Sequence, residues 1–228
     1  ILLLLSSYMN VLITGGSGGI GRKIVDHYIA HGHKVLSPSS LELDLSLGDN
    51  LAESYFSENK KIDIFVHCAG VNNPTPFLEL EQSNIEKTLN TNVLSCMKIA
   101  KLILPHMIKN KFGRIVNISS LWSILSVPDR MAYSLSKAAL DGLTRNLAVE
   151  FGVNGVLVNS VLPGFVDTSL TRRNLSNRKI QEIINETPIK RLVPSEDVAN
   201  LVYFLGSDSN NSITGQSVVI DGGISITR

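Results

Sequence analysis

The chain has 228 residues, 43% of them apolar and 18% charged, which supports a folded domain with a hydrophobic core and excludes a disordered chain. Its 21 basic and 20 acidic side chains leave a net charge of +1, so there is no electrostatic basis for binding nucleic acid or an anionic membrane. Two cysteines are too few for a disulfide framework and form no CxxC pair, so we expect a reduced, cytoplasmic protein.

The N-terminal residues 1–8 precede the first strand pattern. The apolar run Ile1 to Leu5 is too short to span a membrane and lacks the basic region of a signal peptide. Because Met9 directly precedes a buried-strand pattern, we interpret residues 1–8 as an extension and residues 9–228 as a single domain. A short genuine strand or tail is the alternative.

Short apolar runs alternate with helical patterns along the chain. The runs are rich in β-branched residues, as strands buried on both faces should be, and cover 11–13, 34–36, 62–66, 114–118, 156–161 and 217–220. Helical patterns lie at 20–30, 47–59, 82–110, 131–151 and 195–206. This alternation predicts an α/β fold, a single-domain Rossmann-like doubly wound parallel sheet with helices on both faces. The irregular, basic segment 165–191 is expected to be an insertion with its own helices.

A glycine-rich turn, residues 14–21, joins the first strand to the first helix. Glycine lets the main chain approach a phosphate closely, and the following helix N-terminus offers N–H groups and a positive dipole end. Because the turn stands between the first strand and first helix of a βαβ series, it predicts dinucleotide binding. A Walker A phosphate loop is disfavoured, since no Gly-Lys-Ser/Thr closes the motif.

Further motifs follow the glycine turn in a fixed order. The co-linear set is Thr14-Gly15-x-x-x-Gly19-Ile20-Gly21, Cys68-Ala69-Gly70, Ser120, Tyr133-x-x-x-Lys137 and Pro163-Gly164. It resembles the short-chain dehydrogenase/reductase family over almost the whole chain, with the nearest similarity to 3-oxoacyl-carrier-protein reductases and to sugar or alcohol dehydrogenases. The resemblance implies an enzyme that transfers a hydride between the nicotinamide of NAD(P) and a carbonyl or alcohol.

The resemblance assigns catalysis to four residues. Tyr133 would be the general acid/base, and Lys137, one helical turn later, would lower its pKa and hold the nicotinamide ribose. Ser120 would hydrogen-bond the reacting oxygen, whereas Ser119 should point to the opposite face of the strand. Asn92 would hold a water for proton relay. Each has an ordinary structural explanation when taken singly, but their joint register favours function.

The resemblance also assigns the cofactor contacts. They are Gly15, Ser17, Gly19, Ile20, Gly21, Ser37, Asp44, Leu45, Ala69, Gly70, Tyr133, Lys137, Pro163, Gly164 and Thr168. Asp44 and Leu45 would contact the adenine, and the loop after Pro163 would orient the nicotinamide carboxamide. A plain Pro-Gly turn is the competing interpretation of that loop.

Two stretches depart from the family pattern. His67-Cys68 replaces the usual Asn-Asn, a change that should alter packing more than catalysis. A metal at His67 is disfavoured, since no carboxylate or second histidine stands at ligand spacing. The second strand runs into Ser37 and its neighbours without the acidic residue of NAD-preferring members, which favours NADP(H) over NAD(H). The arginine that NADP-preferring members usually carry is absent as well.

Two further sequence features bear on metal binding and on chain length. His27, His31 and His33 are expected at the exposed end of the first helix and in the next turn rather than in a zinc site. Only four residues separate Leu36 from Leu41, where relatives carry a whole helix between the second and third strands. In the family, this short connection lies in the region that binds the adenosine ribose.

The substrate is expected to be a small-molecule or carrier-bound carbonyl compound. Trp122, Leu125, Val127, Phe165 and Leu170 could form an apolar wall near the nicotinamide. The basic residues Arg172, Arg173, Arg178, Lys190 and Arg191 would suit a carboxylated, phosphorylated or carrier-bound substrate, although ordinary surface charge on a lid explains them equally well.

The resemblance implies a homodimer or homotetramer. A nucleotide-sensing protein without catalysis is disfavoured, because both the tyrosine and the lysine are present. An epimerase or dehydratase of nucleotide sugars would need a longer C-terminal substrate region.

Overall fold

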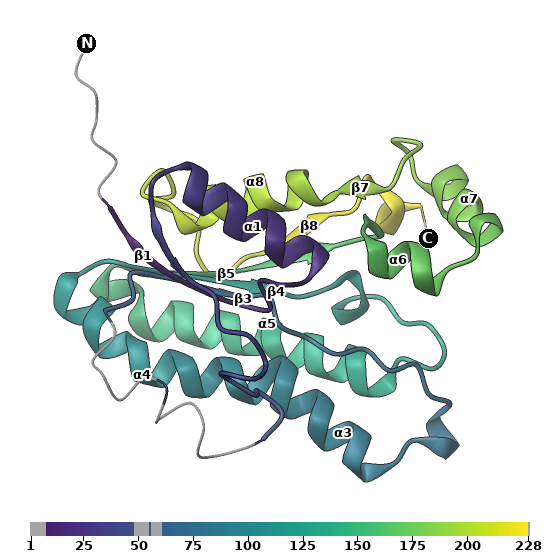
Figure 1. Ribbon diagram of the computed structural model, residues 1–228, viewed down its shortest axis with the longest axis horizontal. Coiled ribbons are helices and arrows are strands. Elements are labelled where there is room, and N and C mark those ends of the chain that lie inside the picture. The colour runs from purple at the N-terminus through teal and green to yellow at the C-terminus, as the bar shows by residue number, and fades with distance from the viewer. Residues whose placement is uncertain (1–7, 48–54, 56–60, 228) are drawn as a thin grey trace.

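A six-stranded parallel sheet forms the centre of the computed structural model, which describes residues 8–47, 55 and 61–227 (Figure 1). Its order is β2-β1-β3-β4-β5-β8. The bounds are Asn10–Thr14 for β1, Lys34–Leu36 for β2, Ile64–His67 for β3, Gly113–Ile118 for β4, Val156–Pro163 for β5 and Ser217–Ile220 for β8. The sheet confirms the predicted Rossmann-like fold, and each expected strand is present.

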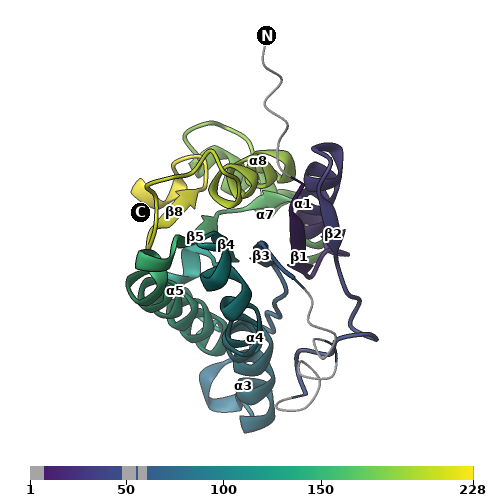
Figure 2. The same ribbon diagram turned by 90° about the vertical axis from the view of Figure 1, so that its left-hand side faces the viewer.

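Helices cover both faces of the sheet. Figures 1 and 2 show α1 (Gly19–Ala30) and α8 (Ser195–Gly206) on one face, and α4 (Ser95–Asn110) and α5 (Met131–Phe151) on the other. The helix expected over 82–110 divides into α3 (Gln82–Leu89), a π-turn η2 (Asn90–Leu94) and α4. No helix in the described part of the chain is long and apolar enough to cross a membrane.

The segment after β2 is short and irregular in the described residues. Residues 37–47 contain turns and neither strand nor helix, so β2 forms the edge of the sheet. A parallel neighbour for β2 would need a crossover of about a dozen residues, and four residues are too few to make one. Most of the helix expected over 47–59 lies outside the described residues.

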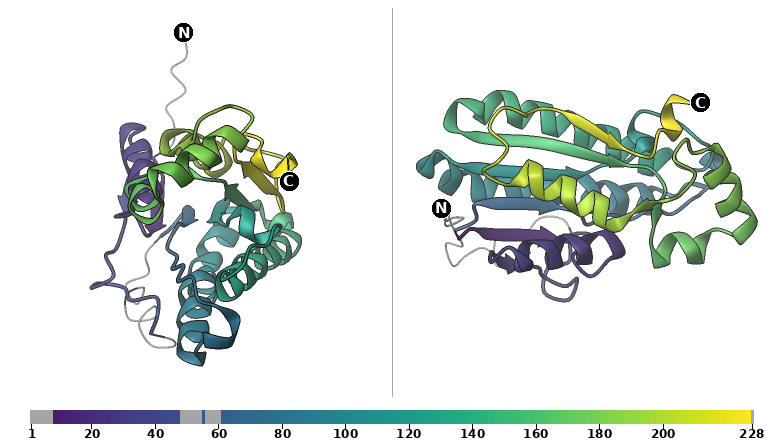
Figure 3. Two further views of the ribbon diagram at one scale, coloured as in Figure 1. Left: turned by 90° about the vertical axis from the view of Figure 1, so that its right-hand side faces the viewer. Right: turned by 90° about the horizontal axis from the view of Figure 1, so that it is seen from above.

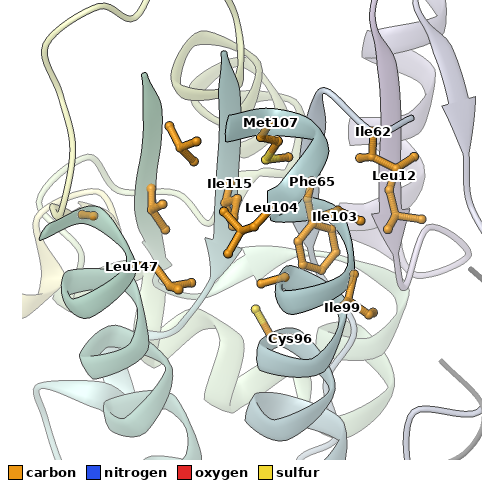
Figure 4. Packing of buried hydrophobic residues seen from close by; sticks show 14 of the residues in the cluster. Leu12, Ile62, Phe65, Cys96, Ile99, Ile103, Leu104, Met107, Ile115 and Leu147 are labelled. Carbon is orange, nitrogen blue, oxygen red and sulfur yellow. The ribbon is translucent and has the colours of Figure 1, made fainter. Parts of the chain in front are cut away.

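Two hydrophobic clusters hold the helices to the sheet. Figure 4 shows the cluster beneath α4, where Phe65 of β3 and Ile115 of β4 pack against Ile99, Ile103 and Met107. The opposite cluster lies between the sheet and the α1–α8 pair and is made of similar aliphatic residues. Full burial of such side chains stabilises by about 1.5–3 kcal/mol each and fixes the strand ends that carry the polar residues described below.

The segment expected to be an insertion forms its own helices beyond one end of the sheet (Figure 3). It contains β6 (Val166–Asp167), α6 (Ser169–Asn174) and α7 (Asn177–Glu186), and β7 (Val193–Pro194) pairs with β6 to close it. A small cluster that includes Ile180, Ile183 and Leu192 joins it to Leu121 and Ile224.

Candidate active site

The glycine turn and the Cys68-Ala69-Gly70 loop meet at the carboxyl edge of the sheet. The turn follows β1 and the loop follows the neighbouring β3. The two backbones approach closely, since a Cβ atom on Gly15 would lie 2.6 Å from Ala69 N. The order of strands reverses at this point, and open α/β sheets bind their ligands in the crevice outside such a point.

The backbone of the glycine turn fits a dinucleotide pyrophosphate. Gly15 has φ +71°, and a Cβ atom on Gly21 would overlap the Gly15 carbonyl oxygen. Ser17, Gly18 and Gly19 are exposed, and the first turn of α1 contains no acidic side chain. The main chain is therefore accessible to a phosphate, and the positive end of α1 favours its charge.

Ser120, Tyr133 and Lys137 come together beside this crevice. Ser120 follows β4, and its hydroxyl accepts from Trp122 N at 3.2 Å and lies close enough to the Tyr133 phenol to lower the phenol's pKa. Lys137 Nζ lies 5.6 Å from the centre of the Tyr133 ring and donates to the Ile118 carbonyl oxygen at 2.7 Å. Ser119 is turned to the backbone of α5, where its hydroxyl lies 3.3 Å from the Lys137 carbonyl oxygen.

Burial shifts the pKa values of both Tyr133 and Lys137. Burial raises the pKa of Tyr133, while the Ser120 hydrogen bond and the Arg130 charge lower it in part. Burial also lowers the pKa of Lys137 to about 8, against smaller raising effects of Cys68 and Asp141. In this structure the effects that lower the pKa of Tyr133 come from Ser120 and Arg130.

Asn92 lies in the π-turn η2 and joins three elements. Its Oδ1 accepts from Val71 N at 2.8 Å, and its Nδ2 donates to the Val71 carbonyl at 3.0 Å and to Ser136 Oγ at 2.9 Å. A Cβ atom on Gly70 would be 3.4 Å from both Asn92 Oδ1 and Lys137 Nζ, so these two side chains meet at Gly70.

Two buried residues of the site were not assigned a role from the sequence. His67 is fully buried between Thr14 and Asn92, and Asp141 lies four residues after Lys137 with Oδ1 unpartnered among the described residues. The departure from the family pattern at His67 and the i,i+4 spacing of Asp141 were the available signals. Cys68, also at the departure, is half-buried, and burial raises its pKa to about 11.

The residues expected around the adenosine divide into two groups. The Ser37 hydroxyl packs against Gly16, so Ser37 joins the glycine turn. Asp44 instead closes its own turn, since its Oδ1 accepts from Ser46 N at 2.9 Å and from Ser46 Oγ at 2.7 Å. Leu45 packs against the core cluster beneath α4.

The residues expected around the nicotinamide lie at the end of β5. Pro163 and Gly164 line a small cavity of about 30 Å³ together with Ser120, Leu121, Trp122 and Phe165. Thr168 caps α6 and its methyl group faces Gly19. Trp122 and Phe165, two residues of the expected apolar wall, form an edge-to-face pair with centroids 6.0 Å apart, and the side chain of Leu170 lies outside the described residues.

The three histidines of the first helix and its turn form an aromatic cluster. His27 and His31 stack with centroids 4.5 Å apart, and Tyr203 of α8 lies over His31 at 4.3 Å. His27 and His33 are half-buried rather than exposed, because Tyr203 covers them. Over the described ranges, no three His, Cys, Asp or Glu side chains are placed to hold a metal ion.

Known proteins share this sequence and this arrangement. The sequence model of the family described as enoyl-(acyl carrier protein) reductase matches residues 44–225. The 3-oxoacyl-(acyl-carrier-protein) reductase FabG of Rickettsia felis is 34% identical over 231 residues, covering 93% of this chain and 95% of that protein.

Solved structures superpose closely on the chain. A 4-hydroxyisoleucine dehydrogenase mutant complexed with NADH and succinate has a TM-score of 0.89 at 28% identity and covers 95% of this chain and 98% of its own. ElxO with NADP bound has a TM-score of 0.86 at 29% identity and covers 96% and 99%. The two complexes contain different dinucleotides on closely similar folds.

Proposed function

Because the chain belongs to the short-chain dehydrogenase/reductase family and is an NAD(P)-dependent oxidoreductase acting on a CH–OH or C=O group, we propose that Asn92, Ser120, Tyr133 and Lys137 are its catalytic residues. The observation that carries the proposal is that Ser120, Tyr133 and Lys137 come together beside the glycine turn, where Ser120 lowers the pKa of the Tyr133 phenol and Lys137 Nζ lies 5.6 Å from its ring centre. This arrangement leaves the Ser120 and Tyr133 hydroxyl groups able to bond one substrate oxygen, which is what a carbonyl reductase needs.

Each residue then has one part in carbonyl reduction. When bound, NAD(P)H would supply the hydride that the carbonyl carbon needs. Tyr133 donates its phenolic proton to the carbonyl oxygen, and Ser120 hydrogen-bonds the same oxygen. The Lys137 ammonium stabilises the resulting phenolate, and its buried position keeps that charge out of water. The Asn92 side chain keeps the loop at Val71 against α5.

NADP(H) is the preferred cofactor in this proposal. The loop after β2 places the Ser37 hydroxyl at the glycine turn without an acidic side chain at that position. Ser39 is engaged elsewhere, because its N–H and hydroxyl both donate to Glu42 Oε2 at 2.8 Å. Dissociation constants for NADPH and NADH, measured by cofactor fluorescence, test the preference, and tighter NADH binding would overturn it.

The proposed substrate is a 3-oxoacyl group on acyl carrier protein, the substrate named for the Rickettsia relative; a sugar or alcohol substrate is the alternative. The basic segment supports a carrier only in part. Arg172 is paired with Asp167 at 2.6 Å and Arg191 with Asp197 at 3.4 Å. Arg178 is likewise paired with Glu182 at 3.1 Å, so much of the positive charge is neutralised within the chain.

A substrate panel tests the activity and the catalytic tyrosine together. NADPH consumption is followed with 3-oxoacyl carrier protein, free ketoacyl thioesters, ketoses and simple ketones. Tyr133→Phe should lower kcat at least about 100-fold on whichever substrate turns over, in line with the usual effect of a general acid. Tyr8→Phe, at an exposed tyrosine, is the matched control. Full turnover by Tyr133→Phe would refute the mechanism.

We further propose a homodimer or homotetramer in the cytoplasm. Met97 and Leu102 of α4 and Leu135 and Val149 of α5 are large apolar side chains exposed on the single chain, which supports burial against another copy. Cys68 and Cys96 are free thiols, which suits a reducing compartment. Light scattering across a concentration series measures the assembly, and a monomer at all concentrations would contradict it.

A further inference from the structure

His67 ends β3 inside the site, and both of its ring nitrogens have a defined partner. Its exposed fraction is 0%. Nδ1 lies 3.0 Å from Thr14 Oγ1, at the end of β1, and Nε2 lies 3.3 Å from the Asn92 carbonyl oxygen in the π-turn. The ring therefore spans from the strand that precedes the glycine turn to the helix that carries the catalytic asparagine.

The chemistry of the partners fixes the direction of these hydrogen bonds. A carbonyl oxygen only accepts, so Nε2 carries the proton and donates to Asn92. Burial and the nearby charge of Lys137 lower the pKa of His67 to about 3, so the ring is neutral and Nδ1 accepts from the Thr14 hydroxyl. Thr14 Oγ1 in turn faces the Ala69 N–H at 3.3 Å. Each group in this chain of hydrogen bonds therefore donates to the next, from the Ala69 N–H through Thr14 and His67 to the Asn92 carbonyl.

Side-chain hydroxyl and ring donors bond to backbone carbonyls of the π-turn. At η2 the Ser95 N–H bonds to the Asn90 carbonyl, five residues back, so the regular helical ladder is interrupted. The Thr91 carbonyl accepts from the Ser95 hydroxyl at 2.8 Å, and His67 serves the Asn92 carbonyl. The loss of one buried hydrogen bond costs about 1 kcal/mol, so removing the His67 donor would weaken the hold on this turn.

The Asn92 side chain transmits this constraint to the catalytic helix. Its Nδ2 donates to Ser136 Oγ at 2.9 Å, and Ser136 donates to the Tyr133 carbonyl oxygen at 2.7 Å. We propose that His67, as the neutral Nε2–H tautomer oriented by Thr14, is a positioning residue that holds the π-turn and thereby the Asn92–Ser136–Tyr133 connection. The inference rests on the proposed catalytic role of Tyr133 and Asn92.

Nitrogen NMR of the wild-type protein tests the tautomer independently of any substrate. The His67 ring should show a protonated Nε2 and an unprotonated Nδ1, with no titration between pH 5 and 8. A protonated Nδ1, or a charged ring in that range, would overturn the proposal. This measurement stands even if the proposed activity fails, whereas full turnover by Tyr133→Phe would refute the activity and leave the tautomer result intact.

Kinetics of two His67 variants separate positioning from packing. His67→Phe keeps a ring but removes both nitrogens, and it should lower kcat about 5- to 50-fold per folded enzyme, the range for one lost buried hydrogen bond. The KM for NADPH should stay within about twofold. His67→Gln, whose amide N–H can reach the Asn92 carbonyl, should recover most of kcat. His106→Phe, which removes a histidine of α4 bonded to Asp63, should leave kcat unchanged.

Other kinetic results would also overturn the positioning role of His67. Full kcat in His67→Phe, or an equal loss in the Phe and Gln variants, would overturn the positioning role. If His67→Phe does not fold, Thr14→Val serves instead, because it removes the hydroxyl that orients Nδ1. It should lower kcat about 2- to 10-fold, with Thr14→Ser restoring it. Unchanged kcat in Thr14→Val would likewise overturn the proposal.

Discussion

Removing the buried charge of Lys137 should stabilise the cofactor-free protein while abolishing its activity. The side chain is 3% exposed, and burial lowers its pKa from 10.5 to about 8. One pKa unit corresponds to about 1.4 kcal/mol, so the charged form costs the native state about 3 kcal/mol at pH 7. Lys137→Met removes that cost and leaves the Ile118 carbonyl without its donor, a loss of about 1 kcal/mol. The net expectation is about 2 kcal/mol of added stability.

The pH dependence follows from the same pKa. Below pH 8 both the folded and the unfolded chain hold the Lys137 proton, so the native state bears the full cost. Between pH 8 and 10.5 the unfolded chain binds the proton and the folded chain does not, so wild-type stability rises by about 1.4 kcal/mol per pH unit. The stability of Lys137→Met does not change with pH through this position, because methionine does not titrate. The difference in free energy of unfolding between Lys137→Met and wild type should therefore shrink from about 2 kcal/mol at pH 7 to below about 1 kcal/mol at pH 9.

Urea unfolding at pH 7, 8 and 9 without cofactor measures the difference. Burial raises the pKa of Cys68 to about 11 and that of Cys96 to about 12, so these thiols ionise first in the unfolded chain, and this lowers the stability of both proteins alike and cancels in their difference. Lys101→Met, at an exposed lysine of α4, is the matched control and should change stability by less than about 0.5 kcal/mol at every pH. A Lys137→Met protein that is less stable than wild type at pH 7, with a gap that does not change with pH, would refute the reasoning.

Three other substitutions have defined expectations. Asp141→Asn removes a carboxylate that raises the pKa of Lys137, so the alkaline limb of kcat/KM should move to lower pH. Gly15→Ala should weaken NADPH binding at least about tenfold and destabilise by about 2 kcal/mol, because φ is +71° and the new Cβ would collide with Ala69 N. Arg114→Met should destabilise by about 3 kcal/mol in urea without changing kcat, because the buried guanidinium donates to four backbone carbonyls.

Each of these has a control and a contradicting result. Glu150→Gln lies on the same helix but is exposed, and an unmoved alkaline limb in Asp141→Asn would contradict the electrostatic coupling. Gly32→Ala shares a positive φ of +80° but meets no atom within 4 Å, so it should destabilise by about 1 kcal/mol and spare NADPH binding. Arg145→Met, at an exposed arginine, should leave the free energy of unfolding unchanged. An equal loss of stability in both arginine variants would contradict the conclusion that the Arg114 hydrogen bonds to backbone carbonyls are stabilising.

The fold could be predicted because its signals are local. Buried strands with β-branched runs, and helices with regular apolar spacing, are visible within short windows of sequence. The π-turn at Asn90–Leu94 was missed for the same reason: the apolar pattern of 82–110 continues across it, and only the hydrogen-bond partners reveal the shift. The position of β2 at the edge of the described strands could be recognised only in part, since the short linker after Leu36 was visible but its consequence for the strand order was not.

The proposed catalytic site was also predictable where it depends on local spacing and unpredictable where it depends on tertiary contacts. Tyr133 and Lys137 are one helical turn apart, so their shared face follows from helix geometry alone. Ser120 and the glycine turn could be placed at strand ends by the alternation of strands and helices, and parallel strands bring such ends to one edge. The pKa of Tyr133 could not be derived this way, because the burial of the phenol and the approach of Ser120 depend on segments distant in sequence.

By itself the sequence determined the doubly wound fold, the family resemblance and the residues that meet at the carboxyl edge of the sheet. Those conclusions depend on spacing within a strand, a turn or a helix. Only the tertiary structure decided that His67 is a neutral donor to Asn92 and that Lys137 is a buried cation with a lowered pKa. Hydrogen-bond direction and desolvation are set by which atoms surround a group, and here those atoms come from β1, β4, α5 and the π-turn.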